Sequence, residues 1–265
     1  MAKLFYVAGI DIGSSYTKTV ILNGDAVIES YNVIPSGAVF EKAAWDSMED
    51  ALAKARLERK DISYILSTGY GRHRVSFANQ NITEINCHAF GAKKTFPECG
   101  MVIDVGGQDS KVILVGDRGM AIRFVMNDKC AAGTGRFLEV MARALEIGIE
   151  EMGAISLRSQ NRVEVSSVCT VFAETEVITL LASGYDKADI VAAIFRAIAR
   201  RLVGFINQIG IKEKIVMTGG VAKGIGLPTV LAEKLKTEIL ISEEPQINGA
   251  FGAAAIALDR ILQRR

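Results

Sequence analysis

A strand that ends in an aspartate and a small-residue turn occurs twice in this sequence, and the repeat limits the folds open to the chain. The first instance runs over Phe5 to Ile12 into Asp11 to Ser15, and β-branched residues resume after it. The second runs over Met101 to Val105 into Asp104 to Lys111, followed by another strand. A spacing of about 90 residues is too long for a solenoid and suits two similar subdomains. The sequence predicts a tandem duplication in which each copy carries a hairpin with a polar tip.

The two hairpin tips have the chemistry of a phosphate and magnesium site. Small residues let backbone amides approach a phosphate, and an aspartate at the mouth can hold Mg²⁺ directly or through water. We therefore expect Asp11 and Asp104 to position Mg²⁺ and phosphate, with the hairpins facing each other across a nucleoside triphosphate. The residues expected to supply backbone or hydroxyl contacts are Gly13, Ser14, Ser15, Gly106 and Gly107.

Two further side chains on these hairpins are candidates for catalysis. Gln108 could orient the attacking water, as glutamine does in other nucleotide hydrolases, so Gln108 and Asp104 form the expected catalytic pair. Lys18 leaves the first hairpin on a strand, where it either reaches a phosphate or is a solvated lysine.

A third glycine-rich turn, Thr218 to Gly224, follows a strand expected over Lys214 to Met217. An aspartate-x-glycine turn is common by itself, but three strand–turn signals in this order are far more specific. Gly219, Gly220 and Lys223 are assigned to the adenosine side of the nucleotide.

The stretch Asn127 to Glu139 combines a thiol with a possible phosphate site. Cys130 lies shortly before a Gly-Thr-Gly turn that opens a helix, whose first amides could face an anion. The turn residues Gly133, Thr134 and Gly135 are expected near the phosphates or ribose. Glu139 either accepts a ribose hydroxyl or is an early-helix glutamate favoured by the helix dipole.

The four cysteines, Cys87, Cys99, Cys130 and Cys169, contain no Cys-x-x-Cys pair. Their spacing gives neither a zinc nor a thioredoxin pattern, and structural disulfides are not expected. Cys130 and Cys169 each precede a predicted helix, with Thr170 as the expected N-cap of the second. The residues alone leave open whether these two are ligands or small buried hydrophobes, and Cys87 and Cys99 are expected to be core thiols. His73 and His88 are expected in loop or surface roles.

Hydrophobic periodicity gives the remaining elements. Strands are expected over 26–33, 62–67, 82–85, 162–167 and 239–240, and helices over 38–57, 87–95, 186–209, 227–235 and 250–262.

Composition excludes several classes of function. The chain has 265 residues, with 31 Lys and Arg against 30 Asp and Glu, and 49% of its residues are hydrophobic. This charge balance supports neither nucleic-acid binding nor a polybasic membrane patch. Asp11 interrupts the N-terminal apolar run too early for a signal peptide or membrane span, so a cytoplasmic protein is expected.

The three turns together resemble the phosphate and adenosine motifs of the acetate kinase, sugar kinase, Hsp70 and actin superfamily. The resemblance implies an α/β fold of two ribonuclease-H-like domains, with mixed sheets flanked by helices and a nucleotide cleft between them. The expected first domain covers residues 1–98 plus 250–265, and the second covers 99–249 and carries the cluster cysteines.

More narrowly, Thr68 to Arg72, Asp104 to Lys111, Asn127 to Glu139 and Ser166 to Val177 resemble the activators (component A) of 2-hydroxyacyl-CoA dehydratases, in the BadF/BadG/BcrA/BcrD ATPase family. The resemblance implies a homodimer holding one 4Fe-4S cluster, with Cys130 and Cys169 of each subunit as ligands. It also implies that hydrolysis of ATP to ADP, with Mg²⁺, drives one electron from ferredoxin or flavodoxin to an iron–sulfur dehydratase or reductase.

Two other functions stay open. A small-molecule kinase of the same superfamily would phosphorylate a sugar or carboxylate, but it needs a catalytic base that the first half of the sequence does not identify. A nucleotide-switched binding module without a redox role would leave Cys130 and Cys169 unexplained.

Overall fold

The structure is a computed structural model that describes residues 5–166 and 169–263. Its Cα positions divide into two compact units. The first consists of described residues within Met1–Gly100, Val115–Ile122 and Gln246–Arg265, and the second of residues within Met101–Leu114 and Arg123–Pro245. The domain boundaries expected from the sequence stay a prediction.

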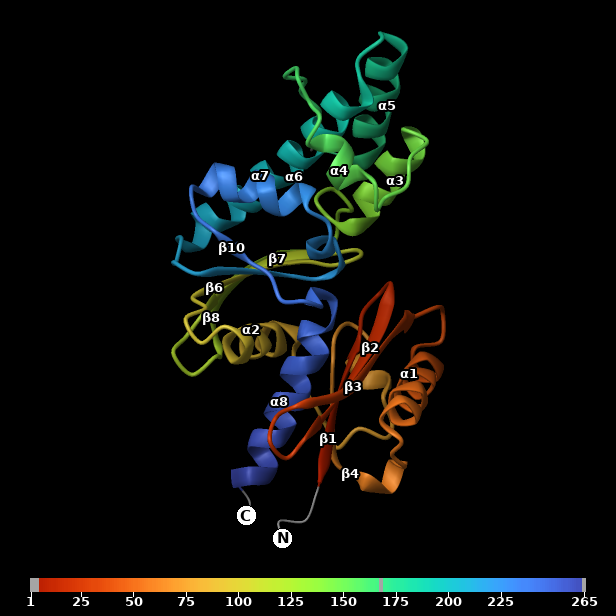
Figure 1. Cartoon of the computed structure of the whole chain (residues 1–265), viewed down its shortest axis with the longest axis vertical. Helices are drawn as coiled ribbons and strands as arrows, with labels where there is room; N and C mark the ends of the chain where they lie inside the picture. Colours follow the sequence, from red (N-terminus) through yellow and green to blue (C-terminus); the bar gives the residue numbers. More distant parts are fainter. Residues whose placement is uncertain (1–4, 167–168, 264–265) are drawn as a thin grey trace. The chain divides into compact units, whose positions relative to one another are not determined.

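The first unit contains a mixed five-stranded sheet in the order β3-β2-β1-β4-β5 (Figure 1). Its strands are β1 (Tyr6–Ile12), β2 (Tyr16–Asn23), β3 (Ile28–Pro35), β4 (Ile62–Thr68) and β5 (Gln80–Asn81). β1 runs antiparallel to β2 and parallel to β4. The hairpin predicted at Asp11 is therefore present, at the end of the central strand.

Helices cover both faces of this sheet, because β1 is apolar on both sides. Ile10 and Ile12 pack with Met48 of α1 (Phe40–Ala55), while Val7 packs against α8 (Asn248–Gln263), which lies beside α2 (Glu84–Thr95). Gly9 faces α8, and a Cβ there would overlap the Ala250 carbonyl oxygen. Close helix–sheet packing therefore requires glycine at this position.

The second unit repeats the same sheet plan. Its strands are β6 (Met101–Val105), β7 (Ser110–Val115), β8 (Ala121–Asn127), β9 (Ile215–Thr218) and β10 (Ile239–Leu240). Their order is β10-β9-β6-β7-β8, which is the order of the first sheet when read from β8. β6 runs antiparallel to β7 and parallel to β9, as β1 does to β2 and β4. The predicted fold class of two ribonuclease-H-like units with mixed sheets and flanking helices is confirmed.

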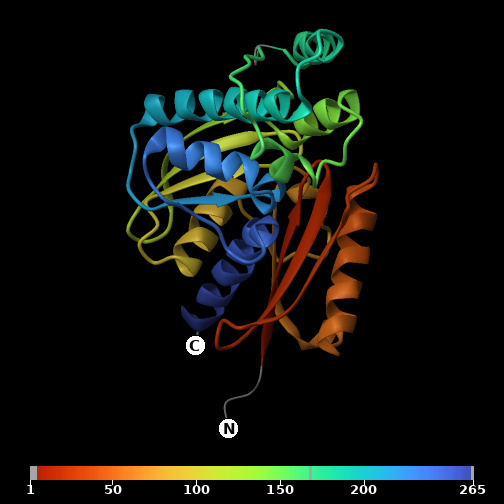
Figure 2. The same cartoon turned by 45° about the horizontal axis from the view of Figure 1, so that its top comes forward.

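The core of the second unit lies between its sheet and its helices. These helices are α3 (Gly135–Ala144), α4 (Met152–Ser156), α5 (Thr170–Ala182), α6 (Lys187–Ile209) and α7 (Gly226–Leu235). α6 and α7 lie side by side over the sheet (Figure 2). Ile194, Ile198 and Leu202 of α6 pack in one cluster with Ile103 and Met217 of the strands.

Several details of the predicted secondary structure were wrong or missing. The strand expected over 82–85 does not form. The strand in this region is the two-residue β5, which ends at Asn81, and Ile85 lies on the buried face of α2, which begins at Glu84. No strand forms over 162–166, and Ser167 lies outside the described residues. Strand β8 had no counterpart in the prediction.

The false strand at 162–166 has a physical cause. Val163 and Val165 are both buried, so the segment alternates as a strand would. Their carbonyl oxygens instead accept hydrogen bonds from Arg196 and Arg200 of α6. Side chains thus satisfy the polar backbone that a sheet would otherwise pair.

Within the described residues, no helix is both long and apolar enough to cross a bilayer.

Candidate functional site

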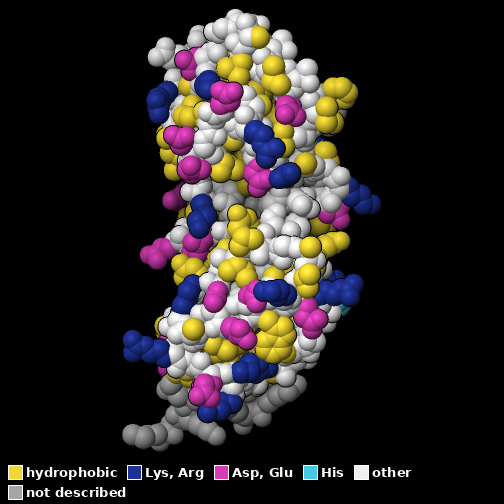
Figure 3. Space-filling view, turned by 90° about the vertical axis from the view of Figure 1, so that its right-hand side faces the viewer, with side chains coloured by type: hydrophobic (Ala, Val, Ile, Leu, Met, Phe, Trp, Pro, Cys, Tyr) yellow, Lys and Arg dark blue, Asp and Glu magenta, His cyan; other side chains and the backbone are white. Residues whose placement is uncertain are grey.

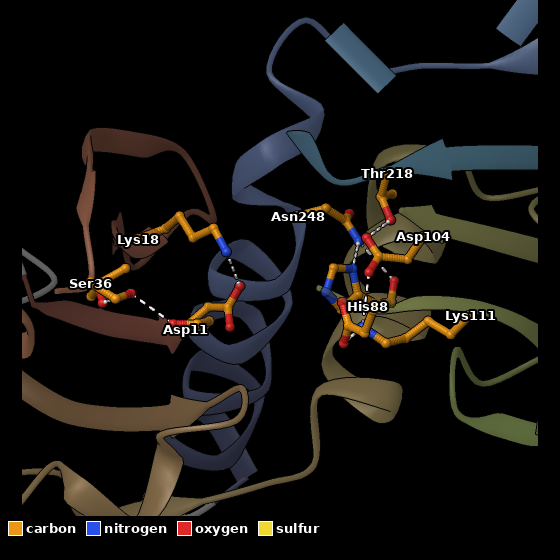
Figure 4. A network of polar contacts seen from close by, with 11 residues as sticks. Asp11, Lys18, Ser36, His88, Asp104, Lys111, Thr218 and Asn248 are labelled. Atoms are coloured by element: carbon orange, nitrogen blue, oxygen red, sulfur yellow. Dashed lines mark hydrogen bonds and ion pairs between the residues drawn. The ribbon is translucent and has the colours of Figure 1, made fainter. Parts of the chain in front are cut away.

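The first hairpin presents Asp11 and Lys18 as a largely buried ion pair. Lys18 Nζ lies 3.0 Å from Asp11 Oδ2, and their side chains are 13% and 6% exposed (Figure 4). The tip is closed by the amide of Gly13, which donates to the Tyr16 carbonyl at 3.0 Å. Ser36 Oγ donates to the Gly13 carbonyl at 2.7 Å. Ser14 and Ser15 are half-buried at the tip.

Two glycines of the same unit flank the Asp11 carboxylate. A Cβ on Gly69, which has φ of +87°, would overlap Asp11 Oδ1. A Cβ on Gly249 would lie 2.9 Å from Asp11 Oδ2 and 3.0 Å from His88 Nε2. Only glycine fits beside this carboxylate on either side, and carboxylate oxygens are the ligands that Mg²⁺ prefers.

The surface or loop role expected for His88 was wrong. His88 is 5% exposed on α2, and its backbone carbonyl accepts a hydrogen bond from Asn248 Nδ2 at 3.0 Å. Ile85, Cys87 and His88 are all buried, because this side of α2 faces α8. His73 lies in the 3₁₀ turn Arg72–Arg74, where it is exposed.

The second hairpin carries a buried charge network. Lys111 Nζ lies 3.0 Å from Asp104 Oδ2 and 2.8 Å from Asp109 Oδ2. Thr218 Oγ1, at the end of β9, donates to Asp104 Oδ1 at 2.7 Å (Figure 4). Both carboxylate oxygens of Asp104 are therefore engaged. Direct coordination of Mg²⁺ by Asp104 stays a prediction, and it would require exchange of one of these partners.

The tip of the second hairpin is closed in the same way as the first. The Gly106 amide donates to the Asp109 carbonyl at 2.9 Å. Gln108 is exposed at the tip, and Gly107 is half-buried beside it. The water-orienting role of Gln108 stays a prediction.

The third turn lies against the second hairpin. Gly219 has φ of +89°, and a Cβ there would overlap the Val105 carbonyl oxygen. Its amide donates to the Pro245 carbonyl at 3.0 Å. Gly220 begins the 3₁₀ helix Gly220–Lys223, and Lys223 pairs with Glu244 at 2.8 Å. The adenosine contacts assigned to these residues stay a prediction.

A side-chain clamp shapes the Cys130 loop. Asn127 Oδ1 accepts the Cys130 amide at 3.2 Å, and Asn127 Nδ2 donates to the Cys130 carbonyl at 2.6 Å and to the Ala132 carbonyl at 3.3 Å. Cys130 itself is half-buried. The loop then closes through Thr134, whose Oγ1 donates to the Ala131 carbonyl at 2.7 Å.

The start of α3 is hydrogen-bonded to the second hairpin. The Gly135 and Arg136 amides donate to the carbonyls of Gly106 and Gly107 at 2.9 and 2.8 Å. These two amides therefore bind the hairpin backbone, although the sequence suggested that the first amides of this helix would face an anion. The hairpin turn and the Cys130 loop are thus joined through one helix end.

The other predicted residues of this stretch have partners of their own. Gly133 has φ of +85°, and a Cβ there would lie 2.9 Å from Arg201 Cδ. Glu139 is paired with Arg136 at 2.8 Å on the surface. Nucleotide contacts by Gly133, Thr134, Gly135 and Glu139 stay predictions.

Cys169 is the N-cap residue of α5, where Thr170 was expected, and Thr170 Oγ1 is buried without a hydrogen-bond partner among the described residues. Cys169 is half-buried, as Cys130 is. Cys87 and Cys99 are both buried, as predicted, and burial raises the pKa of the Cys87 thiol to about 12. In the part of the chain that the structure describes, no group of three or more His, Cys, Asp or Glu side chains could hold a metal ion.

Sequence reasoning assigned no role to Lys111, Asp109 or Asn127. One signal for Lys111 was available: it is the cross-strand partner of Asp104, just as Lys18 is the partner of Asp11. Asn127 comes three residues before Cys130, and asparagine is a residue type whose side chain commonly holds a nearby turn.

The chain matches known proteins over nearly its whole length. The chain is 44% identical to the 2-hydroxyisocaproyl-CoA dehydratase activator of Clostridioides difficile, over 96% of this chain and 95% of the relative. It is also 44% identical to the (R)-2-hydroxyglutaryl-CoA dehydratase activating ATPase of Acidaminococcus fermentans, over 95% and 96% of the two chains.

Comparison with solved structures points to the same kind of protein. The activator of the 2-hydroxyisocaproyl-CoA dehydratase from Clostridium difficile with bound ADPNP superposes with a TM-score of 0.93 at 43% identity, covering 98% of this chain and 97% of that one. A ROK family glucokinase from Streptomyces griseus, at 14% identity, a TM-score of 0.58 and coverage of 96% and 99%, shares the fold alone. The BadF/BadG/BcrA/BcrD ATPase family matches residues 8–257. The chain therefore belongs to the BadF/BadG/BcrA/BcrD ATPase family.

Proposed function

We propose that this protein is an ATP-dependent activator that delivers one low-potential electron to an iron–sulfur partner enzyme. The names of its relatives, a dehydratase activator and an activating ATPase, support the activator and ATPase roles. The solved relative with bound ADPNP supports binding of ATP and ADP. The electron donor is a reduced ferredoxin or flavodoxin, and the acceptor is a 2-hydroxyacyl-CoA dehydratase, a benzoyl-CoA reductase or a related reductase.

The nucleotide is assigned to the glycine turns. Asp11 would hold Mg²⁺, directly or through water, because its carboxylate is flanked by Gly69 and Gly249. Lys18 would contact a phosphate, because its Nζ lies at the Asp11 carboxylate and would be 3.2 Å from a Cβ placed on Gly13 at the tip. Gln108, exposed at the second tip, would orient the attacking water.

One observation supports the proposal that nucleotide binding affects the surroundings of the Cys130 thiol. The carbonyls of Gly106 and Gly107 hold the first amides of α3, and the Cys130 loop leads directly into that helix. A nucleotide-dependent shift of the hairpin turn would therefore move the end of α3 and, with it, the loop that carries Cys130. ATP hydrolysis would then change the surroundings of the thiol.

The cysteines of one chain fit half of a 4Fe-4S site. Thiolates are the usual ligands of such clusters, and a cube needs four of them. Cys130 and Cys169 are half-buried in the same unit, whereas the other two cysteines are buried. A cluster bound here supplies one electron at low potential. Two subunits would each contribute Cys130 and Cys169, which makes the protein a homodimer around a two-fold axis.

Helix α5, which begins after Cys169, supports a second copy as the occupant of that surface. Val171, Phe172 and Ile178 are 65%, 68% and 52% exposed. The buried residues of this helix are Ala173 and Val177. An exposed apolar helix surface of this kind marks an interaction site. Because the proposed cluster needs cysteines from a second subunit, we assign this surface to contact with the same helix of that subunit.

Figure 3 shows one face of the molecule, on which hydrophobic side chains lie among interspersed Lys, Arg, Asp and Glu side chains.

The deciding experiment is anaerobic purification with measurement of iron and acid-labile sulfide per dimer. We expect about four of each for the wild-type protein and loss of both for Cys130→Ser. Cys99→Ala, a buried cysteine outside the proposed site, is the matched control and should keep the cluster. A wild-type protein that stays free of iron after anaerobic reconstitution would refute the electron-transfer role.

The same preparation tests the kinase alternative. A kinase would release ADP in proportion to an added sugar or carboxylate and would be indifferent to Cys130→Ser. The proposed activator should instead hydrolyse ATP without such an acceptor.

A further inference from the structure

The two hairpins place a lysine at equivalent positions but use it differently. Lys18 and Lys111 are the cross-strand partners of Asp11 and Asp104. The Lys18 side chain is 13% exposed and contacts the Asp11 carboxylate. The Lys111 side chain is 3% exposed and lies between two carboxylates. The second lysine is therefore held inside the hairpin.

This placement leaves one carboxylate of the second hairpin accessible. The side chain of Asp104 is 3% exposed, with Lys111 on one oxygen and Thr218 on the other. The side chain of Asp109 is 27% exposed and pairs with Lys111 through Oδ2. Its Oδ1 lies against the turn, because a Cβ at Gly106 would overlap it.

The charges of the network favour a cation at this turn. Asp104, Asp109 and Lys111 together carry a net charge of −1, and the lysine that partly neutralises them is shielded from water. A bare phosphate would be repelled by such a turn, whereas a phosphate accompanied by a divalent cation would not.

We propose that Asp109, held by Lys111, is the carboxylate of the second hairpin that contacts the divalent cation of the bound nucleotide, directly or through its water. Asp104 then has a structural role: with Lys111 and Thr218 it ties the tip of the hairpin to the end of β9. This inference rests on the nucleotide binding proposed above, and it names Lys111 as a positioning residue.

The test is a titration of nucleotide binding with Mg²⁺, using ADPNP and a matched series in EDTA. Asp109→Asn should raise the apparent dissociation constant for Mg²⁺ in the complex about tenfold or more. Its affinity for ADPNP in EDTA should not fall, since the carboxylate contributes only through the cation. Asp117→Asn, which removes an exposed carboxylate from the β7–β8 turn, should leave both constants unchanged.

Two further variants separate positioning from coordination. Lys111→Arg keeps the charge and should retain most of the Mg²⁺ dependence, while Lys111→Met should lose it together with stability, because two carboxylates are left without their cation. Asp104→Asn should lower the thermal midpoint more than Asp109→Asn does, while shifting the Mg²⁺ constant less.

The inference is overturned if Asp109→Asn has the Mg²⁺ dependence of the wild-type protein, or if Asp104→Asn alone shows the cation-specific defect. A wild-type protein that binds no nucleotide would instead refute the proposed function.

Discussion

Asn127 holds Cys130 by both of its backbone polar groups, with its Oδ1 3.2 Å from the Cys130 amide nitrogen and its Nδ2 2.6 Å from the Cys130 carbonyl oxygen. One side chain thus fixes the backbone of the proposed ligand before any cluster is bound. We predict that Asn127→Ala loosens the loop, lowers the free energy of unfolding by about 1–2 kcal/mol and speeds alkylation of Cys130 severalfold.

The rate is measured on the metal-free protein by iodoacetamide labelling and peptide mass spectrometry. Asn23→Ala is the matched control, because Asn23 Oδ1 accepts the amides of Asp25 and Val27 in a turn of the other unit. That variant should lose comparable stability and leave Cys130 labelling unchanged. Equal labelling of Cys130 in Asn127→Ala and the wild-type protein would contradict the clamp.

The four cysteines should divide into two classes of reactivity. Burial is the largest cause that raises the pKa of Cys87 to about 12, so this thiol stays protonated at pH 8. Cys99 is also fully buried. We expect native protein at pH 8 to label at Cys130 and Cys169 within minutes and at Cys87 and Cys99 only after addition of denaturant. Rapid native labelling of Cys87 would show that its side of α2 opens.

Local sequence predicted the hairpins but not the burial of their lysines. The Asp11 turn is determined by neighbours within a few residues, so its strand, glycine and second strand can be recognised in order. The position of Lys111 also depends on Thr218, more than a hundred residues later, which binds the other oxygen of Asp104. The strand prediction over 162–166 failed for the same reason, because side chains of the distant helix α6 supply the hydrogen bonds to this segment's backbone. Burial set by distant segments leaves little trace in local periodicity.

Gly9 should be intolerant of any side chain. A Cβ there would overlap the Ala250 carbonyl oxygen and the Ala254 amide nitrogen, so α8 would have to move away from β1. We predict that Gly9→Ala lowers the free energy of unfolding by about 3 kcal/mol, measured by urea denaturation.

Gly204→Ala is the control for this substitution. Gly204 lies inside α6, and apart from its neighbours and the backbone of its own helix, no atom of the described residues comes within 4 Å of its Cβ position. Alanine has the higher helix propensity, so this change should raise the free energy of unfolding by about 0.5–1 kcal/mol. A Gly9→Ala protein as stable as the wild type would mean that α8 packs less closely on β1 than the structure shows.

Asp189 should give the protein an acid-sensitive contribution to stability. Its carboxylate is buried in the first turn of α6 and accepts hydrogen bonds from Ser159, Gln160 and Asn161. Those bonds, the backbone amide of Asn161 first, lower its pKa from 3.8 to about 2. A depressed folded-state pKa stabilises the fold above the unfolded value and loses that effect as pH falls toward 2. Asp189→Asn should therefore be less stable than the wild type at pH 7, and this difference in stability should shrink between about pH 4 and pH 2. The control is Asp25→Asn, which removes an exposed carboxylate and should show no such convergence. Urea denaturation across this pH range measures both, and a difference that stays constant with pH would refute the assignment.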